Sequence, residues 1–203
     1  MPESIGPHVS GEPAHPSQVA AADRYVIEPM ISRFTVKAVA TGLLSAFGHS
    51  PTIQIRDLKG EIQFHPDAIE QSSLRLVVRA DSLTVADNIS DNDRREIEGQ
   101  MRDQVLETSK YPEIVYVTSK VARQNPDNSN EVVLLGQLSL RGVTRPQKIP
   151  VRLALTGDLL RAFGEFSLRQ TDYNIKPVTA VGGGLKVKDE VKFTFDIAAR
   201  KQT

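Results

Sequence analysis

A strict two-residue alternation of apolar and polar side chains constrains this chain more than any other feature of its sequence. The clearest stretches are 73–80, 148–156 and 191–197, and shorter or less regular ones occupy 33–40, 52–57, 60–64, 113–121, 131–141 and 162–170. A period of two places successive side chains on opposite faces of a strand, so one face of each strand is predicted to be buried. Several such strands, separated by Gly, Asn, Asp and Pro, predict an antiparallel sandwich or barrel.

One segment, residues 90–108, departs from this pattern. Ile97, Met101 and Val105 follow one another at intervals of four residues and form an apolar stripe on an otherwise charged helix, with Ser90 placed to cap its start. We therefore predict an all-β fold of about eight antiparallel strands with one amphipathic helix inserted mid-chain. Eight such strands can close into a barrel whose interior is filled by side chains or holds one small ligand.

Composition excludes several classes of protein. The chain has 25 Lys and Arg against 25 Asp and Glu, and this zero net charge gives no global attraction to nucleic acid. Cysteine is absent, which excludes disulfides and thiolate metal sites. No apolar run approaches the roughly 18 residues that a membrane-spanning helix requires. We therefore expect neither a nucleic-acid partner nor an integral membrane segment.

The N-terminal residues differ in composition from the rest of the chain. Residues 1–23 are rich in Pro, Ser, Gly and Ala and have no continuous apolar region. We predict a disordered Pro-rich tail over 1–23, followed by one β-barrel domain over 24–203. Because the tail lacks the charge and apolar pattern of a signal peptide, the expected compartment is the cytoplasm.

No motif in the sequence indicates catalysis. There is neither a G-x-S-x-G nucleophile motif nor a phosphate-binding loop, and the run Gly182–Gly184 precedes a predicted strand rather than a helix. The four histidines are not spaced to place two imidazoles on one helix face. We therefore predict no catalytic residue, no metal site and no cofactor.

The apolar residues predicted to face inward are the candidate site. Each alone is consistent with a plain hydrophobic core, and together they have the character needed to line an elongated apolar cavity. The candidate lining residues are Phe34, Val36, Ile53, Ile55, Phe64, Leu74, Leu76, Val78, Met101, Tyr116, Leu138, Leu140, Leu153, Phe166 and Leu168.

Four segments together resemble a known family. Residues 138–146, LSLRGVTRP, with Gly136 before them, resemble the G-x-L-T-I/L-x-G-V-T-K/R-P hairpin of the YceI-like family of lipocalin-like, polyisoprenoid-binding proteins. Three further segments are similar to that family in the expected order, ADSL at 80–83, LETSKYPEI at 106–114 and RQTDYNI at 169–175. The resemblance covers about residues 24–199.

The resemblance implies an extended antiparallel lipocalin-like β-barrel, with a helix at its side and a long isoprenoid chain or similar lipid inside. It implies no catalytic residue. The sequence also departs from the family pattern, because Tyr25 occupies the approximate place of the usual tryptophan and Ile31-Ser32 replace a common His-Ser pair. These departures leave the identity of the ligand open.

Three functions follow as hypotheses. The first is non-enzymatic binding of a polyisoprenoid, isoprenoid quinone or fatty-acyl-like lipid for carriage, storage or sensing, with His49, Arg94 and Arg95 at the cavity mouth and a possible homodimer. The second is an enzyme acting on a hydrophobic substrate in the same barrel, with His49 or a buried carboxylate as acid or base. The third is an interaction module with a solid core.

Overall fold

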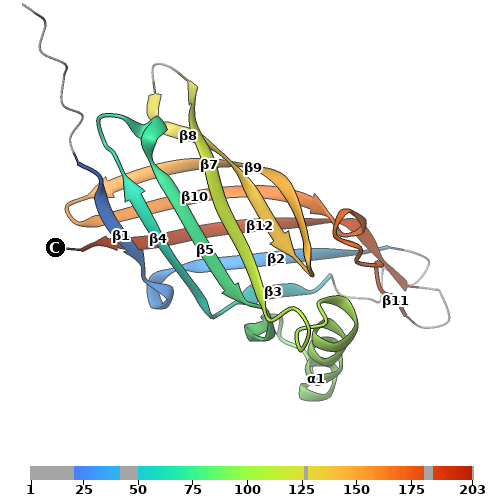
Figure 1. The fold of residues 1–203 in the computed structure, drawn as a ribbon. Coiled ribbons are helices and arrows are strands. Elements are labelled where there is room, and N and C mark those ends of the chain that lie inside the picture. The colour runs from blue at the N-terminus through green and yellow to red at the C-terminus, as the bar shows by residue number, and fades with distance from the viewer. Residues whose placement is uncertain (1–20, 42–49, 126–127, 181–184, 203) are drawn as a thin grey trace, which may run out of the picture.

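Most strands of this protein are arranged in a closed ring around one interior (Figure 1). The computed structural model describes residues 21–41, 50–125, 128–180 and 185–202. Within these ranges the strands are β1 (Asp23–Ile27), β2 (Arg33–Thr41), β3 (Thr52–Ile55), β4 (Leu58–Phe64), β5 (Ser73–Arg79), β6 (Leu83–Val85), β7 (Glu113–Asn125), β8 (Asn128–Leu140), β9 (Val143–Thr156), β10 (Leu159–Arg169), β11 (Thr179–Ala180) and β12 (Leu185–Lys201). The helical elements are α1 (Asp91–Gln100) and short turns η1 (Pro29–Ile31), η2 (Ile69–Gln71), η3 (Ala80–Ser82), η4 (Met101–Val105) and η5 (Gln170–Tyr173).

Eight strands form a closed antiparallel barrel in the order β1-β4-β5-β7-β8-β9-β10-β12. Strand β1 completes the ring because it pairs with both neighbours: Tyr25 lies opposite Ile62 of β4 and Lys201 of β12. The predicted all-β barrel of about eight strands with one helix is thereby confirmed. Figure 1 shows α1 and β11 at one end of the barrel and β1 and the C-terminus at the other.

Three further strands extend one side of the barrel toward α1. Strand β2 pairs with β12, β3 with β2, and β6 with β3. The turns η1 and η3 separate β1 from β2 and β5 from β6. Beside these two turns, which interrupt the strands, serine hydroxyls accept hydrogen bonds from backbone N–H groups. Ser32 Oγ accepts from Ala198 N at 3.0 Å, and Ser82 Oγ accepts from Asp57 N at 3.1 Å. The serine of the ADSL segment thus joins two elements where the sheet ladder is broken.

The amphipathic segment forms α1 and continues into η4. Ser90 Oγ accepts a hydrogen bond from Asp93 N at 3.1 Å, as the capping pattern predicts. The helix then widens into a π turn, in which Leu106 N donates to Met101 O at 2.9 Å. The predicted helix over 90–108 is therefore observed as an α-helix over 91–100 and a π turn over 101–105.

Strand β6 ends the side extension, and α1 lies where its next partner strand would be. Glu98 Oε1 accepts a hydrogen bond from Val85 N at 2.9 Å, and the Arg94 guanidinium donates to the carbonyl oxygens of Val85 and, at 2.9 Å, Asp87. Side chains of the helix thus satisfy the backbone groups that an open sheet edge would leave free. The structural role of Arg94 is therefore to satisfy carbonyl oxygens at the open edge of β6.

We expect Arg94→Met to lower the free energy of unfolding by about 1–2 kcal/mol, because two carbonyl oxygens at the sheet edge lose a charged donor. The matched control is Arg95→Met, since Arg95 is exposed on the same helix and Arg and Met have similar helix propensities. Urea unfolding of the wild type and both variants measures the difference. Equal losses in the two variants would contradict this role of Arg94.

The β8–β9 hairpin turns through Arg141 and Gly142, both with left-handed backbone at φ 50° and 73°. Two such residues give the type I′ turn that fits the twist of a hairpin. The ring of Tyr111 lies against Gly142, where a Cβ would be only 2.6 Å from Tyr111 Cε1. The Arg141 guanidinium donates to Asn174 O and to Glu107 Oε1, so the turn also joins the segments before β7 and after β10.

Gly142→Ala should destabilise the protein by roughly 2–3 kcal/mol, because it adds a clash with Tyr111 to the strain of a left-handed backbone. Gly157 provides the control: it has φ 56° in the β9–β10 turn, but a Cβ there would have no neighbour within 4 Å. Gly157→Ala should therefore cost only about 1 kcal/mol of backbone strain. Chemical denaturation measures both losses, and a Gly142→Ala loss no larger than that of Gly157→Ala would show that the Tyr111 contact is unimportant.

Candidate functional site

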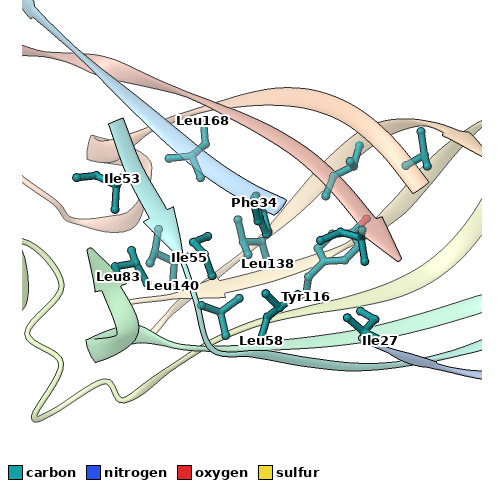
Figure 2. Close-up of a cluster of buried hydrophobic side chains, with 14 of the residues drawn as sticks. Ile27, Phe34, Ile53, Ile55, Leu58, Leu83, Tyr116, Leu138, Leu140 and Leu168 are labelled. Carbon is teal, nitrogen blue, oxygen red and sulfur yellow. The ribbon is translucent and has the colours of Figure 1, made fainter. Parts of the chain in front are cut away.

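An apolar cavity of about 220 Å³ lies inside the barrel. Figure 2 shows side chains from several strands converging on the interior, among them Phe34, Ile55, Tyr116 and Leu138. The full lining consists of Ile27, Phe34, Val36, Ala38, Ile53, Ile55, Ile62, Leu74, Leu76, Val78, Leu83, Met101, Val105, Leu106, Ile114, Tyr116, Leu134, Leu138, Leu140, Ile149, Val151, Ala162, Phe166, Leu168, Gln170, Ile175, Val191, Phe193, Phe195 and Ile197. Every one of these side chains is uncharged.

The period-two alternation is what places these side chains inside. Along β5, Leu74, Leu76 and Val78 line the cavity, whereas Arg75 and Arg79 between and beyond them are exposed. The same rule operates in β12 and β10, so the inner faces of strands far apart in the sequence meet around one apolar space. Of the lining residues predicted from the sequence, all but Phe64 and Leu153 border the cavity.

Phe64 and Leu153 do not border the cavity. Phe64 ends β4, opposite Asp23 of β1, and packs edge-to-face against Tyr25 with 5.9 Å between ring centroids. Leu153 packs half-buried against the core beside Ala162. Near Phe64, the barrel end that holds β1 is filled, because Tyr25 is only 1% exposed. Alternation predicts that a side chain faces inward, but it does not show which end of the interior is filled.

The residues predicted for the cavity mouth lie elsewhere or outside the described ranges. Arg94 holds the edge of β6 and Arg95 is exposed on α1, and neither borders the cavity. His49 lies outside the described residues. The sequence pattern identified α1 correctly, but it gave no sign that Arg94 would be held by backbone carbonyl groups.

Four phenylalanines form one wall of the cavity. Phe166 of β10 and Phe193 of β12 are stacked, with ring centroids 4.6 Å apart and planes at 5°. Phe34 of β2 contacts Phe193 and Phe195 edge-on at 6.1 and 5.9 Å. These contacts follow from register, because Phe166 lies opposite Phe193 and Phe34 opposite Phe195 in the sheet. Such aromatic pairs add stability beyond their burial and make this wall well defined.

Glycines on three strands make room for large side chains that cross the interior. A Cβ on Gly136 would lie 2.7 Å from the Tyr116 hydroxyl, and one on Gly164 would lie 2.5 Å from Phe195 Cζ. Gly60 has the same relation to Ile27, whose Cδ1 would be 2.5 Å away. Each glycine therefore determines how a cavity-lining side chain lies, and Gly136 is the glycine of the matched hairpin motif.

Among the lining residues that the structure describes, Tyr116 and Gln170 are the two whose side chains carry polar atoms that form hydrogen bonds. The Tyr116 hydroxyl donates to Gln147 O at 3.2 Å, and burial raises the pKa of this hydroxyl from its ordinary 10 to about 12. Gln170 Nε2 donates to Lys188 O at 2.8 Å. The sequence pattern does not indicate Gln170, because this residue follows the end of β10, where alternation no longer predicts which way a side chain points.

The helical segment supplies the part of the lining beyond β6. Met101, Val105 and Leu106 all border the cavity. In an α-helix, residues 101 and 106 lie on different faces, and the π turn brings them nearer to one face. The pattern of apolar residues predicted Met101 and Val105 as an inward stripe, but it did not predict the π turn that adds Leu106.

The described residues contain neither a metal-binding cluster nor a membrane-spanning helix. Within the part of the chain that the structure describes, no group of three His, Cys, Asp or Glu side chains is placed to hold a metal ion. None of the helices in the same ranges has the length and apolar character needed to span a bilayer.

Comparison with solved structures shows the same fold in several bacterial proteins. Burkholderia cenocepacia BcnA matches with a TM-score of 0.67 at 16% identity, over 85% of this chain and 98% of that one. A polyisoprenoid-binding domain from Saccharophagus degradans, implicated in plant cell wall breakdown, matches at 0.59 and 15%, over 90% of this chain and 100% of the other. The Campylobacter jejuni YceI protein matches at 0.60 and 13%, over 74% and 85%.

A search of curated proteins finds no match. The model of the YceI-like domain, in contrast, matches residues 25–199, which include the whole barrel apart from the first and last residues of its terminal strands. With the barrel, the side helix and the apolar interior described above, this match shows that the chain belongs to the YceI-like domain family.

Proposed function

We propose that this protein binds one long-chain apolar lipid, an isoprenoid, isoprenoid quinone or fatty-acyl-like chain, inside the barrel and does not convert it chemically. The apolar lining of the cavity is the observation that carries the proposal. Transfer of apolar surface from water to such a lining is favourable by roughly 0.8 kcal/mol for each methylene-sized unit. The length of the buried chain, rather than polar contacts, would therefore supply most of the affinity.

The relatives support this class of ligand. The Saccharophagus degradans domain is described as binding a polyisoprenoid, and it has the same fold as this chain over nearly its entire length. The four-phenylalanine wall gives an isoprenoid or similar chain an apolar aromatic surface to pack against.

The chemistry of the lining favours binding over catalysis. Acid–base catalysis needs a group that titrates near the working pH. Tyr116 is the one lining residue, among those the structure describes, that has an ionisable side chain, and a pKa of about 12 keeps it protonated at neutral pH. No carboxylate borders the cavity within the same residues, which argues against a buried carboxylate as acid or base.

Native mass spectrometry of the protein purified from cells, followed by organic extraction, tests the proposal. We expect a discrete mass increment that extracts as a long-chain lipid of unchanged structure. A protein that carries no lipid and still binds none after incubation with isoprenoid alcohols and quinones would contradict the proposal. Chemical conversion of an added lipid by the purified protein would instead favour the enzyme hypothesis.

Leu76→Asp should reduce lipid binding at least tenfold, because it places a carboxylate in the apolar lining, where a charge without a partner is costly. Arg75→Asp is the control, since Arg75 is exposed one residue earlier on the outer face of β5. Thermal unfolding shows whether each variant is folded. If Leu76→Asp is not, Leu76→Trp, which fills the cavity with apolar volume, serves in its place. Full lipid binding by a folded Leu76 variant would contradict this location of the ligand.

The pKa of Tyr116 predicts a loss of stability at high pH. Below pH 10 the hydroxyl is protonated in both folded and unfolded states, so its contribution to stability is fully present. Between about pH 10 and pH 12 only the unfolded state ionises, and on the order of 2 kcal/mol of unfolding free energy is lost. The wild type should therefore lose more stability than Tyr116→Phe between pH 9 and pH 11.5, as chemical denaturation measures. Equal losses would contradict the raised pKa.

A further inference from the structure

Gln170 is a buried polar residue in an otherwise apolar part of the cavity. It is the first residue of η5, directly after β10, and its side chain borders the cavity with the residue only 7% exposed. Its neighbours in the lining include Leu168 and Val191, which lie opposite each other in β10 and β12. A buried amide is costly unless each of its polar atoms has a hydrogen-bond partner.

The orientation of the Gln170 amide is fixed by its one protein hydrogen bond. Nε2 donates to Lys188 O at 2.8 Å, and because a carbonyl can only accept, the nitrogen must lie on that side. The amide oxygen, Oε1, is then the remaining acceptor. No hydrogen bond to Oε1 is found among the described residues, and Oε1 is not one of their fully buried atoms without a partner, so it keeps some accessible surface. The side chain therefore brings an unused acceptor to an apolar cavity.

The backbone that carries Gln170 is held firmly against β12. Asp189 accepts hydrogen bonds from Thr171 N at 2.8 Å, from Thr171 Oγ1 at 2.7 Å and from Arg169 Nε at 3.0 Å. These bonds hold the residues on both sides of Gln170, next to its own bond to Lys188. Gln170 is thus preorganised, so binding of a ligand to it costs little side-chain conformational entropy.

The rest of the lining limits which polar group could use this acceptor. None of the described lining residues carries a charge that would pair with a phosphate or carboxylate. The one proton of the Tyr116 hydroxyl is already donated to Gln147 O. Among the described lining residues, the Tyr116 hydroxyl and Gln170 Nε2 each already have a protein partner, which leaves Oε1 as the acceptor without one and the second Nε2–H as a donor, and no group there compensates the charge of an ion.

We propose that Gln170 determines ligand specificity by accepting a hydrogen bond from the hydroxyl group of an uncharged lipid alcohol, such as a prenol or fatty alcohol. This inference rests on the proposed function, since it needs the chain to lie in the cavity. It selects among apolar chains by their polar end: an alcohol satisfies Oε1, whereas the corresponding ether leaves it without a donor.

The test compares farnesol with farnesyl methyl ether, which carries the same chain but no hydroxyl donor. We expect the wild type to bind farnesol roughly tenfold more tightly than the ether, as expected for one buried hydrogen bond. In Gln170→Met, which keeps the side-chain length, the two affinities should become equal. Gln137→Met is the control, because Gln137 is exposed on the outer face of β8 and its variant should keep the preference.

Binding of the ether shows whether Gln170→Met is folded with an intact cavity. A second measurement needs no variant: the side-chain amide NMR signals of Gln170 in the wild type should shift with farnesol and change much less with the ether. Equal binding of both lipids by the wild type, or a preference that persists in Gln170→Met, would overturn the role of Gln170 and leave the proposed function standing. If neither lipid binds to the wild type or to either variant, the proposed function is contradicted, and this inference with it.

Discussion

Closure of the sheet by β1 is the constraint on which the interior depends. Only three residue pairs join β1 to β12, from Ile27 opposite Ala199 to Tyr25 opposite Lys201, and these pairs complete the ring. Once the ring is closed, every inward side chain faces other inward side chains rather than solvent. Apolar residues from strands that are far apart in the sequence then surround one space, and the long strand β12 serves as partner to β1, β2, β10 and β11.

The barrel is less regular on the side of β6. There, side chains form the hydrogen bonds to backbone groups that a neighbouring strand would otherwise form. Glu98 and Arg94 meet the free N–H and C=O of Val85, and Ser32 and Ser82 satisfy backbone groups beside the interruptions at η1 and η3. The cavity wall is therefore made mainly of sheet, with the π turn η4 and Leu106 completing it beyond β6. Both parts present apolar side chains inward, so the lining is continuous although the sheet is not.

Alternation in the sequence was sufficient to predict most of this architecture, because one buried face imposes the same period on strand after strand. The residues of β5 show this directly: Leu74, Leu76 and Val78 were predicted to face inward, and they border the cavity. Alternation carries no such information where the backbone leaves the regular strand. Gln170 follows a strand end, and Arg94 makes contacts that depend on how α1 packs. Phe64 was predicted correctly as inward, but whether the space beside it is filled depends on its packing with Tyr25, which no local pattern encodes.

The glycines opposite Tyr116 and Phe195 have a consequence for how sequences of this fold can change. Gly136 and Tyr116 share a single volume, and so do Gly164 and Phe195, since a Cβ on either glycine would overlap the aromatic ring. The backbone adds a second barrier, because a Cβ at 136 would also lie 2.4 Å from Val117 O and one at 164 would lie 2.4 Å from Pro150 O, so a smaller aromatic partner alone would not make room. Related sequences should therefore keep glycine at both positions even where the residues opposite, at 116 and 195, differ.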